Sequence, residues 1–232
     1  MPYRRLPNTD IARIRALKTA IEKCLNTDFR EVAIEMKTLQ EAKNVLSRFE
    51  RIYNQYQQAF DTQVKANILF QQKAKNARMY LSHFVQVLYM CVIRSEIKTE
   101  YLELYGLENQ NMIVPDFSSN ERLLEWGEKI IKGEESRIAE GGVPIFNPTI
   151  AKVKVMFSLF EEGYQTQKIH QKATLRLQNQ VTEAREKVDK VIFDIWEQVE
   201  RKNKDLPLNK RLERNREYGV VYYYRKGETV EE

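Results

Sequence analysis

The sequence has few of the residues that break helices or cross-link small folds. Its 232 residues include only eight glycines, six prolines and two cysteines. This composition excludes a collagen-like, low-complexity or disulfide-rich protein. The cysteines, Cys24 and Cys91, have neither a CxxC nor a metal-ligand spacing, so we expect free thiols that pack as small apolar side chains. The most apolar run, residues 79–93, is interrupted by polar residues and is too short to cross a bilayer.

The sequence also lacks a catalytic or metal-binding pattern. Its only histidines, His83 and His170, have no acidic or cysteine partner at a triad or metal spacing, and we expect a structural role for both. Glutamates are frequent, but the Glu-x-x-His pattern of helical di-metal sites is absent. We therefore assign pairs such as Glu134-Glu135 to solvated helix faces. The sequence predicts a non-enzymatic protein without a metal or a cofactor.

What the sequence does contain is a strong helical period. Asn8, Thr9 and Asp10 offer side-chain oxygens that can cap a first helix, which we expect to end near Leu25-Asn26. A similar short helix should start near Ser119. Apolar residues then follow a heptad-like spacing over residues 39–91 and again over 153–199, with polar residues in the middle of each segment. Both segments predict long amphipathic helices.

Two arrangements of these long helices are compatible with the pattern. In the first, both are continuous and antiparallel, with the short helices packed at their ends. In the second, each breaks into a hairpin, near Asp61 and Gln171, to make a compact bundle. No glycine or proline lies at either point, which favours the first arrangement. We expect the second long helix to be capped by Asn147, with Pro148 at its first position.

The sequence pattern indicates that one helical motif occurs twice in the chain. Two tyrosine-glycine pairs, Tyr105-Gly106 and Tyr218-Gly219, lie 113 residues apart and are typical of helix ends. At a shift of 111 residues, segments 46–53 and 77–85 align with 157–164 and 188–196. The alignment predicts an all-α, elongated bundle of two intertwined repeats, 1–113 and 114–232, each with a short helix, a very long helix and a tail.

Two non-helical features stand out. Residues 220–224 are β-branched and aromatic, and we expect this strand to pair with residues 107–114 as a small β-ribbon. Residues 133–147 contain three glycines and a proline and predict the clearest loop of the chain. This loop precedes a helix N-terminus, where amides could bind an anion, but it lacks the glycine spacing of phosphate-binding loops. A flexible connection is the preferred interpretation.

Positive charge is concentrated near the C-terminal end. Of the net charge of +5, residues 201–226 carry +6 and the remainder −1. Such a segment, followed by three tyrosines, could contact nucleic acid or another anionic partner. Glu213 and Glu217 alternate with the basic residues, which favours a solvated, salt-bridged helix face instead. The candidate contact residues are Arg201, Lys202, Lys204, Lys210, Arg211, Arg214, Arg216 and Arg225.

Three segments carry a resemblance to other proteins: RRLPNTD (4–10), EGGVPIFNP (140–148) and YGVVYYYR (218–225). With these segments the chain resembles an uncharacterised family of bacterial all-helical proteins over nearly its whole length. The resemblance implies an all-helical fold and no activity, cofactor or catalytic residue.

These observations predict a cytoplasmic helical scaffold or protein-interaction protein with a protein partner of unknown identity. A second copy of the chain could cover the apolar stripes, so a homodimer is one form of this hypothesis. The alternative is an adaptor that binds nucleic acid or an anionic surface through the basic segment, with nucleic acid the less favoured partner. An enzyme with a site between the two ends is the least favoured of three classes.

Overall fold

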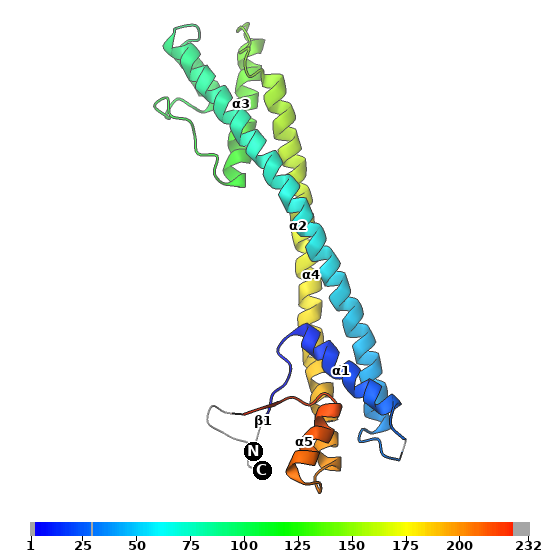
Figure 1. Ribbon diagram of the computed structural model, residues 1–232. Coiled ribbons are helices and arrows are strands. Elements are labelled where there is room, and N and C mark those ends of the chain that lie inside the picture. The colour runs from blue at the N-terminus through cyan, green and yellow to red at the C-terminus, as the bar shows by residue number, and fades with distance from the viewer. Residues whose placement is uncertain (1–2, 29, 225–232) are drawn as a thin grey trace. The chain divides into compact units, whose positions relative to one another are not determined.

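The computed structural model describes residues 3–28 and 30–224, and its architecture is the all-α bundle that the sequence predicts (Figure 1). The helices are α1 (Asp10–Leu25), α2 (Met36–Ile93), the 3₁₀ helix η1 (Thr99–Tyr105), α3 (Asn120–Ala139), α4 (Ile150–Lys202) and α5 (Leu208–Glu217). Two short strands, β1 (Tyr3–Arg4) and β2 (Tyr222–Tyr223), pair antiparallel. Within the described residues, no helix is long and apolar enough to span a membrane.

Side-chain caps fix where the helices begin. Thr9 caps α1, because its side chain accepts a hydrogen bond from the Ala12 amide at 3.2 Å. Ser119 caps α3 in the same way, as predicted. The predicted start of α4 is wrong, because the helix begins at Ile150 and not at Pro148. Thr149 accepts the hydrogen bond there, from the Lys152 amide.

Both long helices are continuous. α2 and α4 pass through Asp61 and Gln171 without a break, so the hairpin arrangement is wrong. α2 ends at Ile93 without a glycine or a proline, because Ser95 adopts a left-handed conformation with φ of 59°. The short η1 helix then ends at Gly106, whose φ of 67° favours glycine, as the Tyr105-Gly106 pair predicts.

The chain folds into two compact units. Unit 1 comprises Met1–Phe60 and Ala173–Glu232, and unit 2 comprises Asp61–Lys172. Each unit therefore contains one part of α2 and one part of α4, so its boundaries differ from the predicted repeats 1–113 and 114–232. The element order does occur twice, as a short helix, a long helix and a short terminal helix. The duplication itself stays a prediction.

The core of unit 1 contains the fully buried Trp196 and is formed by α1, the adjoining parts of α2 and α4, and the segment after α5, with Tyr218, Val220 and Tyr222. The β-ribbon of this unit is not the predicted one. β2 pairs with the N-terminal strand β1, in the register Tyr3↔Tyr223 and Arg4↔Tyr222, whereas residues 107–114 form turns. A pairing between the two ends of the described chain leaves no local signal in the sequence.

Unit 2 has an aromatic core between α2 and α4, to which residues of η1 and α3 also contribute. Figure 1 shows α3 alongside these parts of α2 and α4. The rings of Phe70 and Phe160 stack with centroids 5.9 Å apart. α3 reaches Tyr105 through Gly133, where an added Cβ would lie 2.6 Å from the tyrosine ring. Gly133 is thus inside α3, and the predicted loop is wrong in its first half because this glycine serves close packing. The α3–α4 loop comprises residues 140–149.

Candidate functional site, a cavity beneath the α3–α4 loop

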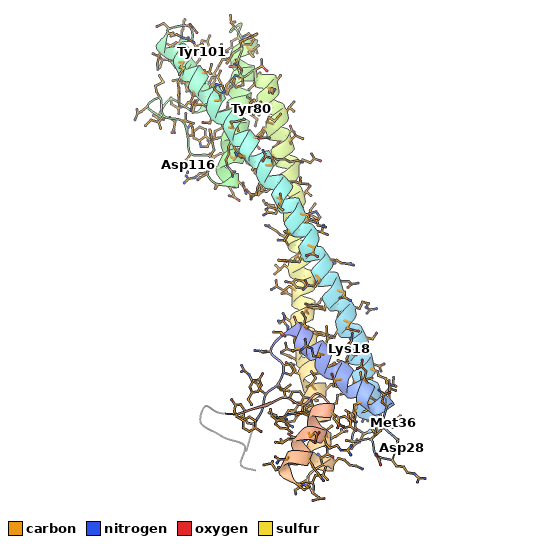
Figure 2. All side chains as sticks on the ribbon, in the orientation of Figure 1. Lys18, Asp28, Met36, Tyr80, Tyr101 and Asp116 are labelled. Atoms are coloured by element: carbon orange, nitrogen blue, oxygen red, sulfur yellow. The ribbon has the colours of Figure 1, made fainter. Side chains whose placement is uncertain are left out.

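A cavity of about 670 Å³ lies in unit 2 between the end of α2, the start of η1 and the α3–α4 loop. Its volume is within the range of ligand pockets. The ring of Tyr101, labelled in Figure 2, and apolar side chains such as Val87 and Ile97 make up much of the lining. The lining also contains three cationic side chains and one carboxylate, namely Arg94, Lys98, Arg137 and Glu96. We refer to this space as the loop cavity.

A buried ion pair lies beside the loop cavity. Glu134 is fully buried and Arg137 is 2% exposed. Arg137 donates from Nη2 to Glu134 Oε1 at 2.8 Å and from Nε to Oε2 at 2.9 Å. The Tyr105 hydroxyl donates to Glu134 and accepts from Arg137 Nε at 2.9 Å. The pair is thus bidentate and hydrogen-bonded to a third side chain, which offsets much of the cost of burying two charges.

The buried ion pair also fixes the α3–α4 loop. Arg137 Nη2 donates to the carbonyl oxygen of Val143 at 2.9 Å, and the Ile145 amide donates to Glu134 Oε1 at 3.1 Å. Gly141 turns the chain with a φ of 91°, a conformation that favours glycine. The expectation of a flexible connection is therefore wrong, because side chains of α3 bind the loop's backbone groups.

The environment keeps Tyr105 and Arg137 in their ordinary protonation states. Burial raises the pKa of Tyr105, and its hydrogen bond to Glu134 raises it further. Burial acts to lower the pKa of Arg137, but the hydrogen bonds to Glu134 and Tyr105 outweigh it, so this pKa is raised. Near neutral pH the site holds a neutral phenol and a charged guanidinium.

The α3–α4 loop presents apolar side chains to solvent above the loop cavity. Val143 is 82% exposed and Phe146 is 90% exposed, whereas Ile145 between them is buried. All three line the loop cavity. We call Val143 and Phe146 the apolar rim. Single exposed apolar residues are common. Packing does not explain, however, why a phenylalanine is almost fully exposed on a loop whose backbone is hydrogen-bonded to side chains of α3.

A larger groove, of about 970 Å³, lies in unit 1 between α2 and α4. Its charged lining residues, such as Arg48, Glu183 and Lys187, belong to exposed or half-buried positions on the two helices. No buried charged group lines it among the residues that the structure describes. We regard the smaller loop cavity as the better site because charge is buried beside it.

The predicted basic residues gather on the end of α4 and on α5. Arg201, Lys202, Lys204, Lys210, Arg214 and Arg216 are exposed, Arg211 is half-buried, and Arg225 lies outside the described residues. Their acidic neighbours do not neutralise them as expected. Glu217 pairs with Lys23 of α1 at 2.7 Å, and in residues 3–28 and 30–224 no ion pair involves these basic side chains or Glu213.

Neither histidine belongs to a cluster of possible metal ligands among the described residues. His83 is exposed on α2, and His170 is half-buried on α4. In the described part of the chain, no three His, Cys, Asp or Glu side chains come together as metal ligands would.

The buried ion pair is the feature that sequence reasoning missed. The interpretation of Glu134 as part of a solvated face is wrong, because the residue is in the core. A signal was present in the spacing. Five of the six buried positions of α3 advance by four and three residues, and this phase includes both charged residues. The five are Leu123, Gly127, Ile130, Glu134 and Arg137, and the sixth is Gly133.

Comparison of the chain with profiles of protein families, with curated proteins and with solved structures finds no match. The resemblance to bacterial all-helical proteins stays a prediction. The geometry described above therefore carries the functional argument.

Proposed function

We propose that the chain is a non-enzymatic helical interaction protein of the cytoplasm, whose protein partner docks on the apolar rim over the loop cavity. The observation that supports this proposal is Phe146, which is 90% exposed although the residues around it are bound to a buried ion pair. Aromatic side chains placed beside a pocket are the usual anchors of protein interfaces.

The physical advantage of such a loop is preorganisation. A flexible loop loses conformational entropy when a partner orders it, at a cost of about 0.5–1.5 kcal/mol for each immobilised side chain. The α3–α4 loop is already bound through Val143 and Ile145, so less of that cost falls on binding. Covering the Phe146 ring then removes apolar surface from water. Glu134 neutralises Arg137, and the other charged side chains of the lining sum to +1, which favours a partner segment that carries negative charge.

Site-specific photo-cross-linking tests this proposal. A photoreactive phenylalanine analogue replaces Phe146 in one variant and Ile169 in a matched control, since Ile169 is also exposed in unit 2. We expect a partner to be captured from the native host at position 146 and not at 169. The purified partner should then bind Phe146→Ala about 10-fold or more weakly than wild type, with Ile169→Ala unchanged. Equal capture at both positions, or full affinity of Phe146→Ala, rejects the proposal.

A second candidate is the adaptor that binds an anionic surface through the basic segment. It is favoured by the exposed basic side chains of α5, which have no ion-pair partner in the described structure. Binding to a single-stranded oligonucleotide and to anionic vesicles would be titrated from about 50 to 200 mM salt. We expect affinity that falls steeply with salt and is lost in Lys210→Glu/Arg214→Glu. Absence of binding at the lowest salt rejects this candidate.

A further inference from the structure

The buried ion pair leaves one nitrogen of Arg137 unused. A guanidinium has five N–H donors, of which Nε carries one and each terminal nitrogen two. Nε and Nη2 of Arg137 donate to Glu134, to Tyr105 and to the Val143 carbonyl. Among the described residues, none accepts a hydrogen bond from Nη1. Arg137 as a whole is 2% exposed, but Nη1 is not among its fully buried atoms, so the small accessible area of the residue includes this nitrogen.

The unused nitrogen lies beside Gly142, at the lining of the loop cavity. Arg137 and Gly142 both line this space. A Cβ added at Gly142 would lie 2.8 Å from Nη1, so only a glycine at this position leaves room beside that edge of the guanidinium. Nη1 has no acceptor among the described residues, so it can donate to an oxygen placed in the cavity.

The net charge of the cavity lining matches a ligand group with a single negative charge. Glu134 already neutralises Arg137. The remaining charged lining residues are Arg94, Lys98 and Glu96, with a sum of +1. A monoanion would balance this charge, whereas a phosphate dianion would bring one uncompensated charge between apolar walls such as Val87 and Ile97.

We propose that the loop cavity recognises a carboxylate, supplied by an acidic side chain of the partner segment that covers the apolar rim. The carboxylate accepts hydrogen bonds from Arg137 Nη1, and apolar residues beside it in the same segment contact Phe146. This assignment rests on the proposed function. It adds the chemistry of the group that enters the cavity, and an arginine is well suited to that group.

A pair of small probes tests carboxylate recognition without the partner. The full chain would be titrated with 4-phenylbutyrate and with its neutral amide, which has nearly the same shape. Cys91 lines the loop cavity, whereas Cys24 is buried in unit 1, so thiol labelling reports on the cavity. We expect millimolar 4-phenylbutyrate to slow labelling of Cys91, and the amide to act at least about 5-fold more weakly. Cys91→Ser identifies the protected thiol, and saturation-transfer NMR provides a second readout.

Charge variants sharpen the test without touching the buried ion pair. Lys98→Glu should weaken 4-phenylbutyrate binding severalfold, because it reverses the charge balance of the lining. Lys75→Glu, on an exposed part of α2 outside the lining, should leave binding unchanged. Equal action of acid and amide, or no binding of the acid by either readout at about 20 mM, overturns carboxylate recognition.

The outcomes also separate this inference from the proposed function. If Phe146→Ala abolishes partner binding but the probes show no preference for charge, only the carboxylate inference fails. If the acid binds selectively but position 146 captures no partner, the interaction proposal fails and the cavity remains a carboxylate site.

Discussion

In unit 1 the short helix α1 presents Ala16 and Ala20 to the core, whereas in unit 2 the short helix α3 presents Gly127 and Gly133. Alanine keeps the neighbouring backbone and side chains at ordinary contact distance. The glycines let α3 approach so closely that a Cβ at Gly127 would lie 2.1 Å from the Phe157 ring. Two units with a similar composition of helices therefore differ in how tightly the short helix can pack.

The two units also place their charges differently. In unit 1, Arg13 of α1, which is 9% exposed, binds the half-buried Asp189 of α4 at 2.7 Å, and Asp10 binds the half-buried Arg185 at 2.7 Å. We call these two pairs the edge pairs. In unit 2 the Glu134–Arg137 pair is in the core. The edge pairs join two helices. The buried pair binds a loop, and that loop carries Phe146, the most exposed aromatic side chain among the described residues.

In the corresponding connection of unit 1, the described residues 26–28 and 30–35 make no hydrogen bond to a buried ion pair. The Ala33 amide of this connection donates to the hydroxyl of Tyr218, and its Glu35 amide donates to Gln198 Oε1. These are neutral hydrogen bonds near the surface, which contribute less than charge-assisted ones in the core. The buried ion pair therefore distinguishes the α3–α4 loop, which holds exposed apolar side chains in place, from a connection that only joins two helices.

The largest expected effect comes from breaking the buried ion pair. Arg137→Met leaves Glu134 charged and unpaired in the core, so we expect unfolding to become easier by about 3–5 kcal/mol in chemical denaturation. Glu134→Leu/Arg137→Met is the control, because it removes both charges and should regain most of the loss. A loss below about 1 kcal/mol in the single variant would show that the pair is not buried as described.

The glycine contact should give the next largest effect. Gly133→Ala places a Cβ 2.6 Å from the Tyr105 ring and 2.7 Å from the Leu104 carbonyl oxygen. We expect a loss of about 1–3 kcal/mol from overpacking, despite the higher helix propensity of alanine. Ala20→Gly in α1 is the reciprocal change and should cost about 1 kcal/mol through propensity and about 1 kcal/mol more through loss of the buried methyl group. Thermal unfolding that shows stabilisation by Gly133→Ala would contradict the close approach.

An edge pair of unit 1 should matter less and should respond to salt. Arg13→Met removes the bond to Asp189, and we expect a loss of about 1 kcal/mol at low ionic strength. Because the pair is partly exposed, the loss should shrink in about 1 M salt. An undiminished loss in salt would place this pair in the same class as the buried one.

Alkaline pH provides a weaker probe of unit 1. Burial, together with a hydrogen bond to Glu200, raises the pKa of Tyr222 from 10.0 to about 12. A raised folded-state pKa stabilises the protein below the unfolded-state value, and this contribution is lost as pH rises between these two values. We expect stability to fall over that range, and Tyr222→Phe to flatten the fall. Phenolate absorbance measured in parallel would reveal an unperturbed Tyr222 by its early titration.

The smallest effect on stability is expected at the apolar rim. Phe146→Ala removes a side chain that is 90% exposed, so the free energy of unfolding should change by less than about 0.5 kcal/mol. The variant is thus expected to lose partner binding and keep its fold. A large loss of stability would indicate that the ring packs within the chain, and would remove the support for a docking surface.

Local patterns in the sequence predict most of the helices. The Thr9 cap, the two tyrosine-glycine ends and the heptad-like spacing each act within a few residues. The aligned positions Phe49 and Phe160 are both buried in the core of their unit, although the compact units cut across the predicted repeats.

Features that depend on distant partners could not be predicted in this way. β2 pairs with β1 from the opposite end of the described chain, and Glu217 finds Lys23 rather than a neighbour in its own helix. The prediction from sequence places Glu134 in solvent because it gives charge more weight than helical phase. The loop cavity needs both the ion pair and the loop, so it could be recognised only once the structure placed them together.

Hydrogen exchange at the Ile145 amide tests most directly whether the buried ion pair orders the α3–α4 loop. This amide donates to Glu134 Oε1 in the core. We predict that it exchanges as slowly as amides in the middle of α3 in the wild type, and that Arg137→Met accelerates its exchange. Exchange in the wild type as fast as in an unstructured peptide would contradict the account.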